Sequence, residues 1–306
     1  MKITIGTRAS QLALAQTELA RIALLRSGLV DKIEVRIINT TGDRRLDVRL
    51  SDSGPHVEKG LFTKELEQAL LNREIDVAVH SLKDLPTETA VPVVAVLPRE
   101  DPVDVLISKT PHDLGTLPKG ALIATGSPRR AHQITYRRPD LQVSDIRGNV
   151  PTRIEKLVRS ENWSAVVLAR AGLRRLGLEE EQGRLRFGQS LLFVTELPEM
   201  LPAAGQGAVA LQCRKEDGAI RSKLERINHQ ETWSCVTAER EFLRLIGGGC
   251  NVPIGVRAHS VEESMTITAI VFEGTGKVRS GSVTLRFQSP LEAAKVLFRE
   301  IYAEPR

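Results

Sequence analysis

Arginine is concentrated in one part of this 306-residue chain, together with hydroxyl and amide side chains that bind anions. Residues 121–175 hold ten arginines and one lysine against four acids, a net charge of +7, whereas the whole chain carries only +5. A guanidinium presents a planar pair of donors that matches a carboxylate or a phosphate. The stretch therefore predicts a site for a polyanionic ligand; the alternative explanation of the composition is codon bias toward arginine.

Three motifs with this chemistry lie where predicted strands end and helices begin: Thr7-Arg8-Ala9-Ser10, Thr125-Gly126-Ser127-Pro128-Arg129-Arg130 and Arg147-Gly148-Asn149. A helix N-terminus leaves N–H groups free at the positive end of the helix dipole, so it favours an anion. Arg129 and Arg130 oppose that dipole unless an anion is bound beside them, which makes this pair the most informative. The alternative at each motif is a solvated arginine beside a helix-capping serine, Ser10 or Ser127.

The segment His80-Ser81-Leu82-Lys83-Asp84 supplies the candidate for catalysis. It ends a predicted strand, where the adjacent His80 and Ser81 point to opposite sides, so a Ser-His-Asp triad is not favoured. No Gly-x-Ser-x-Gly motif occurs either. Asp84, a lone carboxylate beside Lys83 at the mouth of an arginine-rich cleft, is the predicted catalytic residue; the alternative is an Asp that caps a loop.

Cys250 follows three consecutive glycines, which leave its thiol sterically accessible. We therefore predict a nucleophile or a covalent attachment point rather than a buried core cysteine. The other two cysteines, Cys213 and Cys235, have no metal-ligand spacing to it, so we expect no metal site. Three cysteines are also too few for a disulfide framework.

The motifs above need a fold that brings strand ends together. Alternating period-2 and period-3.6 patterns in the first two hundred residues predict α/β sheets with helices on both faces, and such sheets bind ligands at the carboxyl ends of their strands. Predicted strands cover residues 3–6, 33–39, 75–80, 93–97, 103–108, 122–125, 142–146 and 165–169, and predicted helices cover 11–26, 63–73, 129–137 and 152–159.

Proline-bearing stretches at residues 97–102 and 197–202 predict two crossover linkers of a discontinuous two-domain arrangement. After residue 228 the pattern changes to a helix at 232–246, strand-like runs at 254–258, 265–272 and 278–287, and a final helix at 291–302. These elements predict a small α+β domain.

Composition limits the remaining functional classes. Hydrophobic residues make up 41% and charged residues 26%, as in globular proteins. No run of 18 apolar residues and no apolar signal core occurs, so we expect a cytoplasmic protein without membrane contact. Nucleotide-binding motifs are absent and aromatics are 4%, which disfavours base stacking. Two alternatives to an enzyme stay open: a two-lobed binding protein for an organic acid, and a nucleic-acid-binding module attracted by the +7 stretch.

Seven motifs together resemble the porphobilinogen deaminase, or hydroxymethylbilane synthase, family. In the family's order they are residues 7–10, 59–62, 79–86, 147–149, 171–173, 205–208 and 249–255, of which 79–86 and 249–255 are the most specific. The resemblance implies two type II periplasmic-binding-protein-like lobes with discontinuous connectivity, plus a small C-terminal α+β domain with a three-stranded antiparallel sheet. It divides the chain into domain 1 (residues 1–98 and 206–226), domain 2 (99–205) and domain 3 (227–306).

The resemblance also implies a transferase. It condenses four porphobilinogen molecules head to tail with loss of ammonia onto a covalent primer, and then releases linear hydroxymethylbilane, a precursor of haem and related tetrapyrroles, by hydrolysis. Cys250 would hold the primer, a dipyrromethane cofactor, through a thioether. Asp84 would contact pyrrole N–H groups and stabilise the cationic azafulvene formed when ammonia leaves. Since each pyrrole unit carries an acetate and a propionate, the growing chain needs many fixed cations.

The other site residues that the resemblance implies bind carboxylates or cover the site. The cofactor-binding set is Ser81, Lys83, Thr125, Ser127, Arg129, Arg130, Arg147, Asn149, Arg153 and Gln206. Arg8, Ser10 and Arg175 would bind substrate, and Asp43 and Lys59 would belong to an active-site loop. The family usually has Ser and Leu where this chain has Gly126 and Pro128, so one hydroxyl is missing. The implied partners are porphobilinogen and, for the product, uroporphyrinogen III synthase, with no nucleic acid, and the enzyme is expected to be a monomer.

Overall fold

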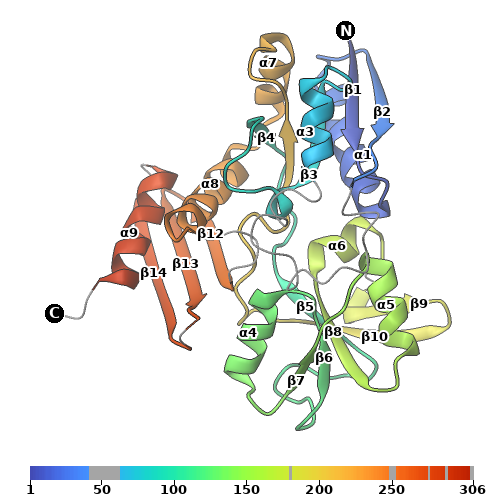
Figure 1. The fold of residues 1–306 in the computed structure, drawn as a ribbon, viewed down its shortest axis with the longest axis vertical. Helices are drawn as coiled ribbons and strands as arrows, with labels where there is room; N and C mark the ends of the chain where they lie inside the picture. The colour runs from blue at the N-terminus through green and yellow to red at the C-terminus, as the bar shows by residue number, and fades with distance from the viewer. Residues whose placement is uncertain (41–62, 179–180, 248–252, 275, 287–288, 304–306) are drawn as a thin grey trace.

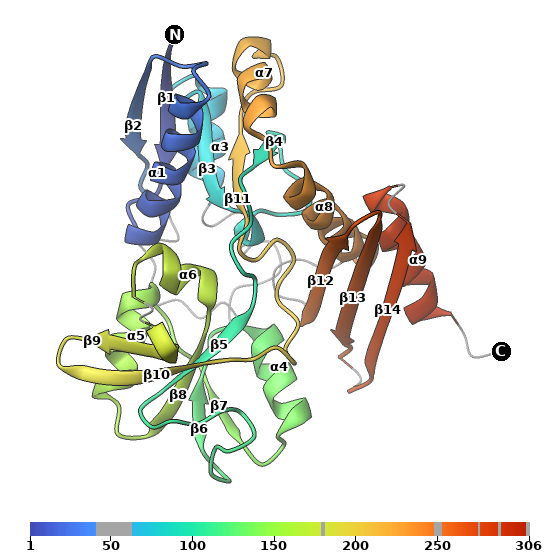
Figure 2. The ribbon, with the colours of Figure 1, turned by 180° about the vertical axis from the view of Figure 1, so that it is seen from behind.

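The structure, a computed structural model, describes residues 1–40, 63–178, 181–247, 253–274, 276–286 and 289–303. Within these residues the strands form three separate sheets. The first sheet, with the N-terminus, and the second lie at opposite ends of the molecule, and the third stands beside them (Figure 1). Two extended crossovers run between the first two sheets, at residues 97–103 and 197–208 (Figure 2). In this part of the chain no helix combines the length and apolar character that crossing a membrane requires.

The first sheet has the strand order β2-β1-β3-β11-β4. Its strands are β1 (Lys2–Thr7), β2 (Lys32–Ile37), β3 (Val77–Ser81), β4 (Val93–Val96) and β11 (Val209–Gln212). Helices α1 (Gln11–Arg26) and α7 (Gly218–Ile227) share one buried apolar cluster with this sheet, and α3 (Lys64–Leu71) packs in another. A short 3-10 turn, η1 (Leu82–Asp84), follows β3 directly.

The second sheet has the order β7-β6-β8-β5-β10-β9. Its strands are β5 (Asp104–Ser108), β6 (Leu122–Ala124), β7 (Gln142–Ser144), β8 (Trp163–Ala169), β9 (Arg184–Phe187) and β10 (Ser190–Glu196). Its helices are α4 (Pro128–Arg137), α5 (Val150–Arg159) and α6 (Arg170–Arg175), with a 3-10 turn η2 (Glu181–Gly183) before β9.

The two sheets share one plan. In each, three parallel strands stand in the order second, first, third, and the next strand runs antiparallel. That antiparallel strand is β5 in the second sheet, entered after β4, and β11 in the first sheet, entered after β10. The chain therefore crosses between the sheets twice, which confirms the expected class of two α/β lobes with discontinuous connectivity.

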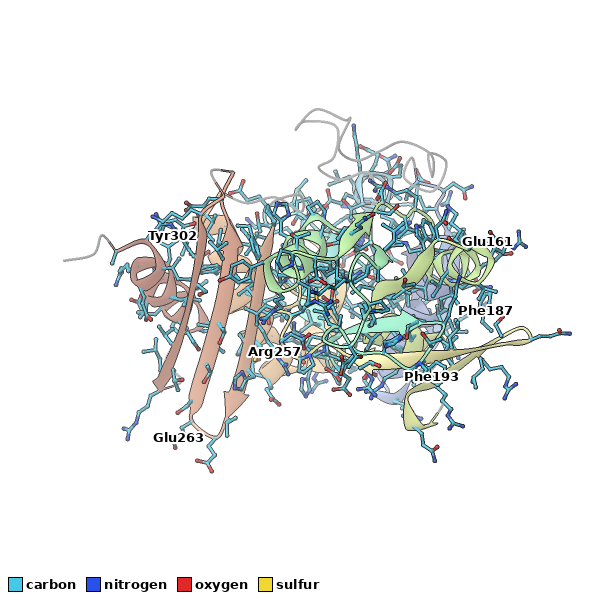
Figure 3. All side chains as sticks on the ribbon, turned by 90° about the horizontal axis from the view of Figure 1, so that it is seen from below. Glu161, Phe187, Phe193, Arg257, Glu263 and Tyr302 are labelled. Carbon is cyan, nitrogen blue, oxygen red and sulfur yellow. The ribbon has the colours of Figure 1, made fainter. Side chains whose placement is uncertain are left out.

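The third sheet is antiparallel and contains β12 (Ile254–Val261), β13 (Ser264–Phe272) and β14 (Val278–Arg286). Helices α8 (Gln230–Leu245) and α9 (Pro290–Tyr302) bury their apolar faces with it. Figure 3 shows this unit on one side of the molecule and the β9–β10 hairpin, labelled at Phe187 and Phe193, on the other. The expected three-stranded antiparallel sheet with its two helices is confirmed.

The starts of helices α1 and α4 agree only in part with the expectation. Ser10 caps α1, since its Oγ accepts a hydrogen bond from the backbone N–H of Ala13 (3.3 Å). Ser127 stands at the corresponding position of α4, but its side chain makes no capping hydrogen bond, so its predicted capping role is wrong. Pro128 occupies the first turn instead, where a missing N–H costs nothing and the fixed φ suits a helix.

Candidate active site

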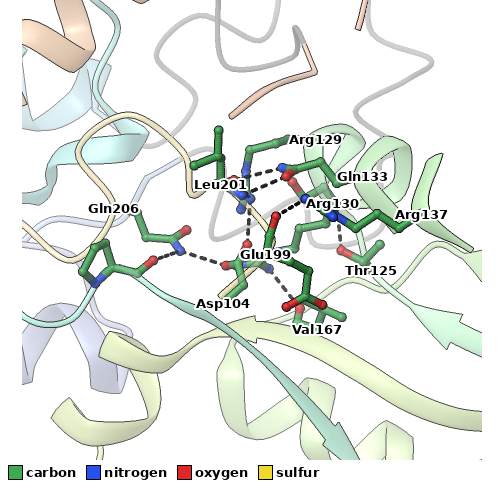
Figure 4. A network of polar contacts seen from close by, with 12 residues as sticks. Asp104, Thr125, Arg129, Arg130, Gln133, Arg137, Val167, Glu199, Leu201 and Gln206 are labelled. Atoms are coloured by element: carbon green, nitrogen blue, oxygen red, sulfur yellow. Dashed lines mark hydrogen bonds and ion pairs between the residues drawn. The ribbon is translucent and has the colours of Figure 1, made fainter. Parts of the chain in front are cut away.

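Arg129 and Arg130 are buried, with about 5% of their surfaces exposed, in the first turn of α4. Their charges converge on one carboxylate, Asp104, the first residue of β5 (Figure 4). Arg129 donates to Asp104 Oδ2 at 2.7 Å, and the Nη2 of Arg130 donates to Oδ1 at 2.8 Å. The anion that compensates this unfavourable pair is therefore, in the first place, a side chain of the protein itself.

The crossovers brace this cluster from both sides. Gln206, in the second crossover, donates from Nε2 to Asp104 Oδ1 at 2.8 Å and to the carbonyl of Pro102 at 2.6 Å. Arg129 donates to the carbonyl of Leu201 at 2.6 Å, and Gln133 of α4 both donates to and accepts from the backbone of Leu201. The arginine pair is thus fixed at the joint between the two lobes.

Asp104 is ionised in this setting. Burial opposes the charged form, but the charges of Arg129 and Arg130 and their hydrogen bonds outweigh burial and hold the pKa of Asp104 well below its ordinary value. Burial also lowers the pKa of Arg129, with Asp104 opposing and Arg130 adding to that shift. One buried carboxylate thus faces two buried cations, so the cluster keeps a net positive charge.

Replacing Asp104 by Asn is expected to lower the free energy of unfolding by about 3 kcal/mol, because it leaves two buried guanidinium groups without their counter-ion. Because the folded pKa of Asp104 is depressed, its contribution is present above the ordinary carboxyl pKa and is lost as the pH falls below it. Thermal unfolding at pH 7 and in acid measures both effects.

The control is Asp140→Asn, which removes the partly exposed ion pair of Asp140 with Arg138. Such a pair contributes about 1 kcal/mol or less. Equal losses in the two variants at pH 7 would contradict the role of Asp104.

Lys83 and Asp84 face this cluster from the first lobe. Both lie in η1 at the end of β3 and are partly buried. Lys83 is close enough to Asp104, Arg129 and Arg130 for their charges to act on its pKa. The structure therefore brings together side chains from two sheets that stand far apart in the sequence.

Arg153 adds a further cation beside Arg129 and Arg130, and we call these three arginines together with Arg147 the positive wall. It lies on α5, donates to the carbonyl of Gly148 at 2.7 Å, and has its pKa lowered to about 10 by burial and then by the charge of Arg130. Arg147 also acts on Arg153, and it pairs with Asp145 at 3.0 Å. Asp84 acts on Arg153 with the opposite sign, which brings the carboxylate of η1 near the same wall.

Other predicted residues serve the scaffold around this wall. Asn149 caps α5 by accepting from the N–H of Thr152 at 3.0 Å. Ser81 accepts a hydrogen bond from Gln16 of α1 at 2.8 Å. Thr125 Oγ1 accepts from the N–H of Ser127 at 3.3 Å.

The missing hydroxyl at Gly126 has a structural reason. A Cβ at this position would lie 2.6 Å from the carbonyl oxygen of Ile146, so the loop after β7 occupies the space a side chain would need. Glycine lets the loop that follows β6 and the loop that follows β7 approach closely.

The predicted substrate-binding residues are distributed around the joint. Arg8 follows β1, and its charge acts on the buried His80, whose pKa falls to about 4 mainly through burial. Arg175, at the end of α6, donates to the carbonyl of Gly207 in the second crossover. Asp43, Lys59 and Cys250 lie outside the described residues, so their predicted roles stay predictions.

Sequence reasoning missed Asp104 and Gln133, which hold the arginine pair in place. A signal for Asp104 was available, because it is the one charged residue in the predicted strand at 103–108. A charge in a buried strand requires a partner. No comparable sequence signal marks Gln133, since its partner is the backbone of a crossover.

The group of charges at this joint suits a ligand with several carboxylates. Five cations (Lys83, Arg129, Arg130, Arg147 and Arg153) stand against the three carboxylates of Asp84, Asp104 and Asp145. The Nε of Arg129 is buried and finds no hydrogen-bond partner among the described residues. An unpaired donor and excess positive charge together fit an organic polyanion.

Two family models match the chain. The model described as "Porphobilinogen deaminase, dipyromethane cofactor binding domain" covers residues 3–222, and "Porphobilinogen deaminase, C-terminal domain" covers residues 233–302. The chain is 47% identical over 282 residues to the porphobilinogen deaminase of Shouchella clausii, covering 90% of this chain and 86% of the relative. It is 43% identical over 305 residues to that of Syntrophomonas wolfei, covering 98% and 94%.

Among solved structures, the chain is similar to the methionine-binding protein MetQ, with a TM-score of 0.44 and 12% identity. That similarity covers 76% of this chain and 92% of MetQ.

Proposed function

This chain belongs to the porphobilinogen deaminase family, and from that premise we propose that the cleft between its first two sheets holds the dipyrromethane cofactor and carries the reaction. The protein is a transferase that joins four porphobilinogen molecules head to tail, with loss of one ammonia from each. The chain grows on the covalently bound cofactor and is released by hydrolysis as linear hydroxymethylbilane.

The observation that supports the site assignment is that a carboxylate and several cations from both lobes lie together where the lobes join. Asp84 and Lys83 come from the first lobe, and the arginines come from α4 and α5 of the second. A binding protein for an organic acid needs only the cations. The partly buried carboxylate of Asp84 among them adds a group that suits a cation formed during catalysis.

The cations divide the work of holding carboxylates. Arg147 and Arg153 stand on the wall formed by the β7–α5 connection and α5, and Lys83 supplies a point charge from the opposite lobe. Arg129 has a buried Nε available, while Asp104 keeps its guanidinium in a fixed orientation. Fixed donors bind a flexible acidic chain without reorganising when it arrives. When bound, the dipyrromethane would supply the free pyrrole carbon to which the first substrate is joined, and each added unit would supply that carbon for the next.

Asp84 stabilises positive charge on the substrate. When the amino group of the aminomethyl substituent of porphobilinogen leaves as ammonia, the methylene carbon stays on the ring and the remaining pyrrole becomes a cationic azafulvene. A carboxylate held in advance beside that position lowers the barrier, as donors of an oxyanion hole do for negative charge. The charge of Asp84 acts on the neighbouring Lys83 and Arg153, so its carboxylate lies beside the cations proposed to hold the acid groups of the substrate.

Cys250 is the proposed attachment point of the cofactor. Burial raises the pKa of Cys213 to about 11 and raises the pKa of Cys235. A buried thiol that resists ionisation is a poor nucleophile. These two cysteines are therefore unsuited to form the thioether, which favours Cys250 after its three glycines.

The wider assignment follows the same premise. We infer the division into domain 1 (residues 1–98 and 206–226), domain 2 (99–205) and domain 3 (227–306), supported by how the chain passes among the three sheets. The enzyme is proposed to act as a cytoplasmic monomer and to pass its product to uroporphyrinogen III synthase. Asp43 and Lys59 are proposed to belong to a loop that covers the site.

The direct test of the function is the stoichiometry of the reaction. Purified protein is expected to consume four porphobilinogen molecules and release four ammonia molecules for each hydroxymethylbilane, read as uroporphyrin after cyclisation and oxidation. Consumption without ammonia release, or binding without consumption, would contradict the assignment.

The charge of the Lys83 amine is expected to change near neutral to mildly alkaline pH. Burial is the main cause that lowers its pKa from the ordinary 10.5 to about 8; Asp84 opposes this shift and Arg130 adds to it. In cofactor-free protein, acetylation by acetic anhydride is expected to reach half its maximum at Lys83 near pH 8, as followed by peptide mass spectrometry. Carboxylates bound in the cleft are expected to raise this midpoint, because they favour the charged amine.

The consequence for binding has a definite sign. As the pH rises through about 8, Lys83 loses its charge, so the site binds carboxylates less tightly. An arginine at this position would stay charged. Lys83→Arg is therefore expected to remove the loss of substrate affinity above pH 8. A midpoint of Lys83 acetylation above about pH 10 would overturn this account.

A further inference from the structure

A cavity of about 250 Å³ lies outside the charged cleft, between α8 and the first lobe. Its apolar end is formed by Trp233 and Val236 of α8, Val93 and Val96 of β4, and Leu82 of η1. This volume is just below the usual range for drug-sized ligands, so the cavity suits a molecule with one or two rings.

The other end of the cavity is charged. The α8 face that lines it continues at helical spacing from Trp233 through Arg240 to Glu241 and Arg244. Arg240 donates to the carbonyl of Leu85 at 3.0 Å. Arg244 donates from Nε and Nη2 to the two carboxylate oxygens of Glu241 at 2.7 and 2.8 Å.

Positive charge is in excess at this end. Two further charges act on the ion pair, Glu88 on Arg244 and Lys295 on Glu241. With these included, three cations stand against two carboxylates. Threonine hydroxyls at positions 87, 89 and 237 complete the polar rim.

We propose that this cavity is a binding site for a small aromatic monocarboxylate. The ring lies against Trp233 and the valines, and the carboxylate reaches Arg244, whose side chain is 48% exposed. Arg244 then shares its donors between the ligand and Glu241. A dicarboxylate or a cationic ring fits less well, because a single excess positive charge is available.

The site is joined to the catalytic turn. Leu82, which lines the cavity, is followed directly by Lys83 and Asp84. Leu82 also packs against the second crossover, where a Cβ on Gly205 would lie 2.8 Å from its Cγ. A ligand in the cavity therefore contacts the far side of the turn that presents the catalytic carboxylate.

The test measures the binding of 2-iodobenzoate to the cofactor-carrying protein. The readout is the quenching of tryptophan fluorescence by the iodine atom of the ligand. The chain has two tryptophans, so Trp163→Phe leaves Trp233 as the reporter. We expect saturable quenching below 1 mM ligand, on the order of the affinity that one ring and one charge give. The neutral analogue 2-iodobenzamide is expected to bind about fivefold more weakly.

Two rim variants are expected to move the affinity in opposite directions. Arg244→Gln should weaken 2-iodobenzoate binding about fivefold, and Glu241→Gln should strengthen it by a similar factor, because that carboxylate no longer competes for Arg244. Arg221→Gln is the matched control, since Arg221 forms a comparable ion pair with Glu225 on α7, and it should change nothing. Val236→Phe, which fills the cavity, should abolish saturable quenching.

The arginine cleft is the competing place for an aromatic acid to bind. Quenching that is lost in Arg147→Gln but kept in Val236→Phe would overturn the proposal, as would rim variants without effect. The assay reads binding alone, so its failure leaves the deaminase assignment untouched.

Discussion

Asp84→Asn is expected to lower turnover by a factor of about 10³, while the protein folds and keeps its covalent cofactor. The substitution preserves the size of the side chain but removes the negative charge proposed to face the substrate cation. Loss of one preorganised electrostatic partner in a catalytic site costs about 10²–10³ in rate. Asp84 is in addition the proposed carboxylate nearest the reacting atoms, which places its effect at the upper end of that range.

The matched control for this experiment is Glu216→Gln. Glu216 is an exposed carboxylate of the same lobe, between β11 and α7, and belongs to neither proposed ligand site. It should retain turnover within about twofold, since surface changes away from a site have small effects. Porphobilinogen consumption measures turnover, and intact mass measures cofactor retention. Turnover near the wild-type value in Asp84→Asn would remove the residue from the mechanism.

Cys250→Ser is expected to abolish covalent pigment and reduce product formation to background. A serine hydroxyl is far less nucleophilic than a thiol, so no stable link to the dipyrromethane forms. Without the primer, no acceptor is present to which the first porphobilinogen can be joined, although the arginines that bind its carboxylates remain. The expected readouts are an intact mass without an adduct and no colour with Ehrlich's reagent.

The two buried cysteines provide the control. Cys213→Ala and Cys235→Ala should keep the adduct, because the pKa of each thiol is raised by burial and neither is suited to the attachment. An adduct that survives in Cys250→Ser and disappears in either of these variants would reassign the attachment point.

Most of the architecture could be predicted from local patterns. Helix α1 occupies the predicted residues 11–26, since Ser10 caps its start and Gly28 follows its end. The predicted strands of the first two hundred residues also occur, within a few residues at their ends. Buried parallel strands give long apolar runs, which makes them easy to recognise.

Two of the elements missed have weak local signals, whereas helix α7 (Gly218–Ile227) and the hairpin β9–β10 carry patterns that could have been recognised. Strand β11 has four residues and follows a crossover, so its place between β3 and β4 depends on contacts distant in sequence. Helix α6 has six residues, too few for a period of 3.6 to emerge. The hairpin β9–β10 alternates buried Leu185, Leu192 and Val194 with exposed residues, and Gly188 at a positive φ makes its turn.

The site divides in a similar way. Residue types and strand ends were sufficient to select the cations, because each lies just after a predicted strand or at a helix start. The burial of Arg129 and Arg130 on Asp104 could not be predicted, since it depends on how β5 passes beneath α4. Sequence identifies the charges of a cleft more readily than the partners that fix them.

We propose that this chain elongates an acidic pyrrole polymer on a primer that it holds covalently. Intact-protein mass spectrometry after a brief exposure to limiting porphobilinogen tests it directly. We expect a ladder of species, in which the protein with its dipyrrole carries one, two, three or four further pyrrole units. A single unmodified mass while porphobilinogen is consumed would contradict it.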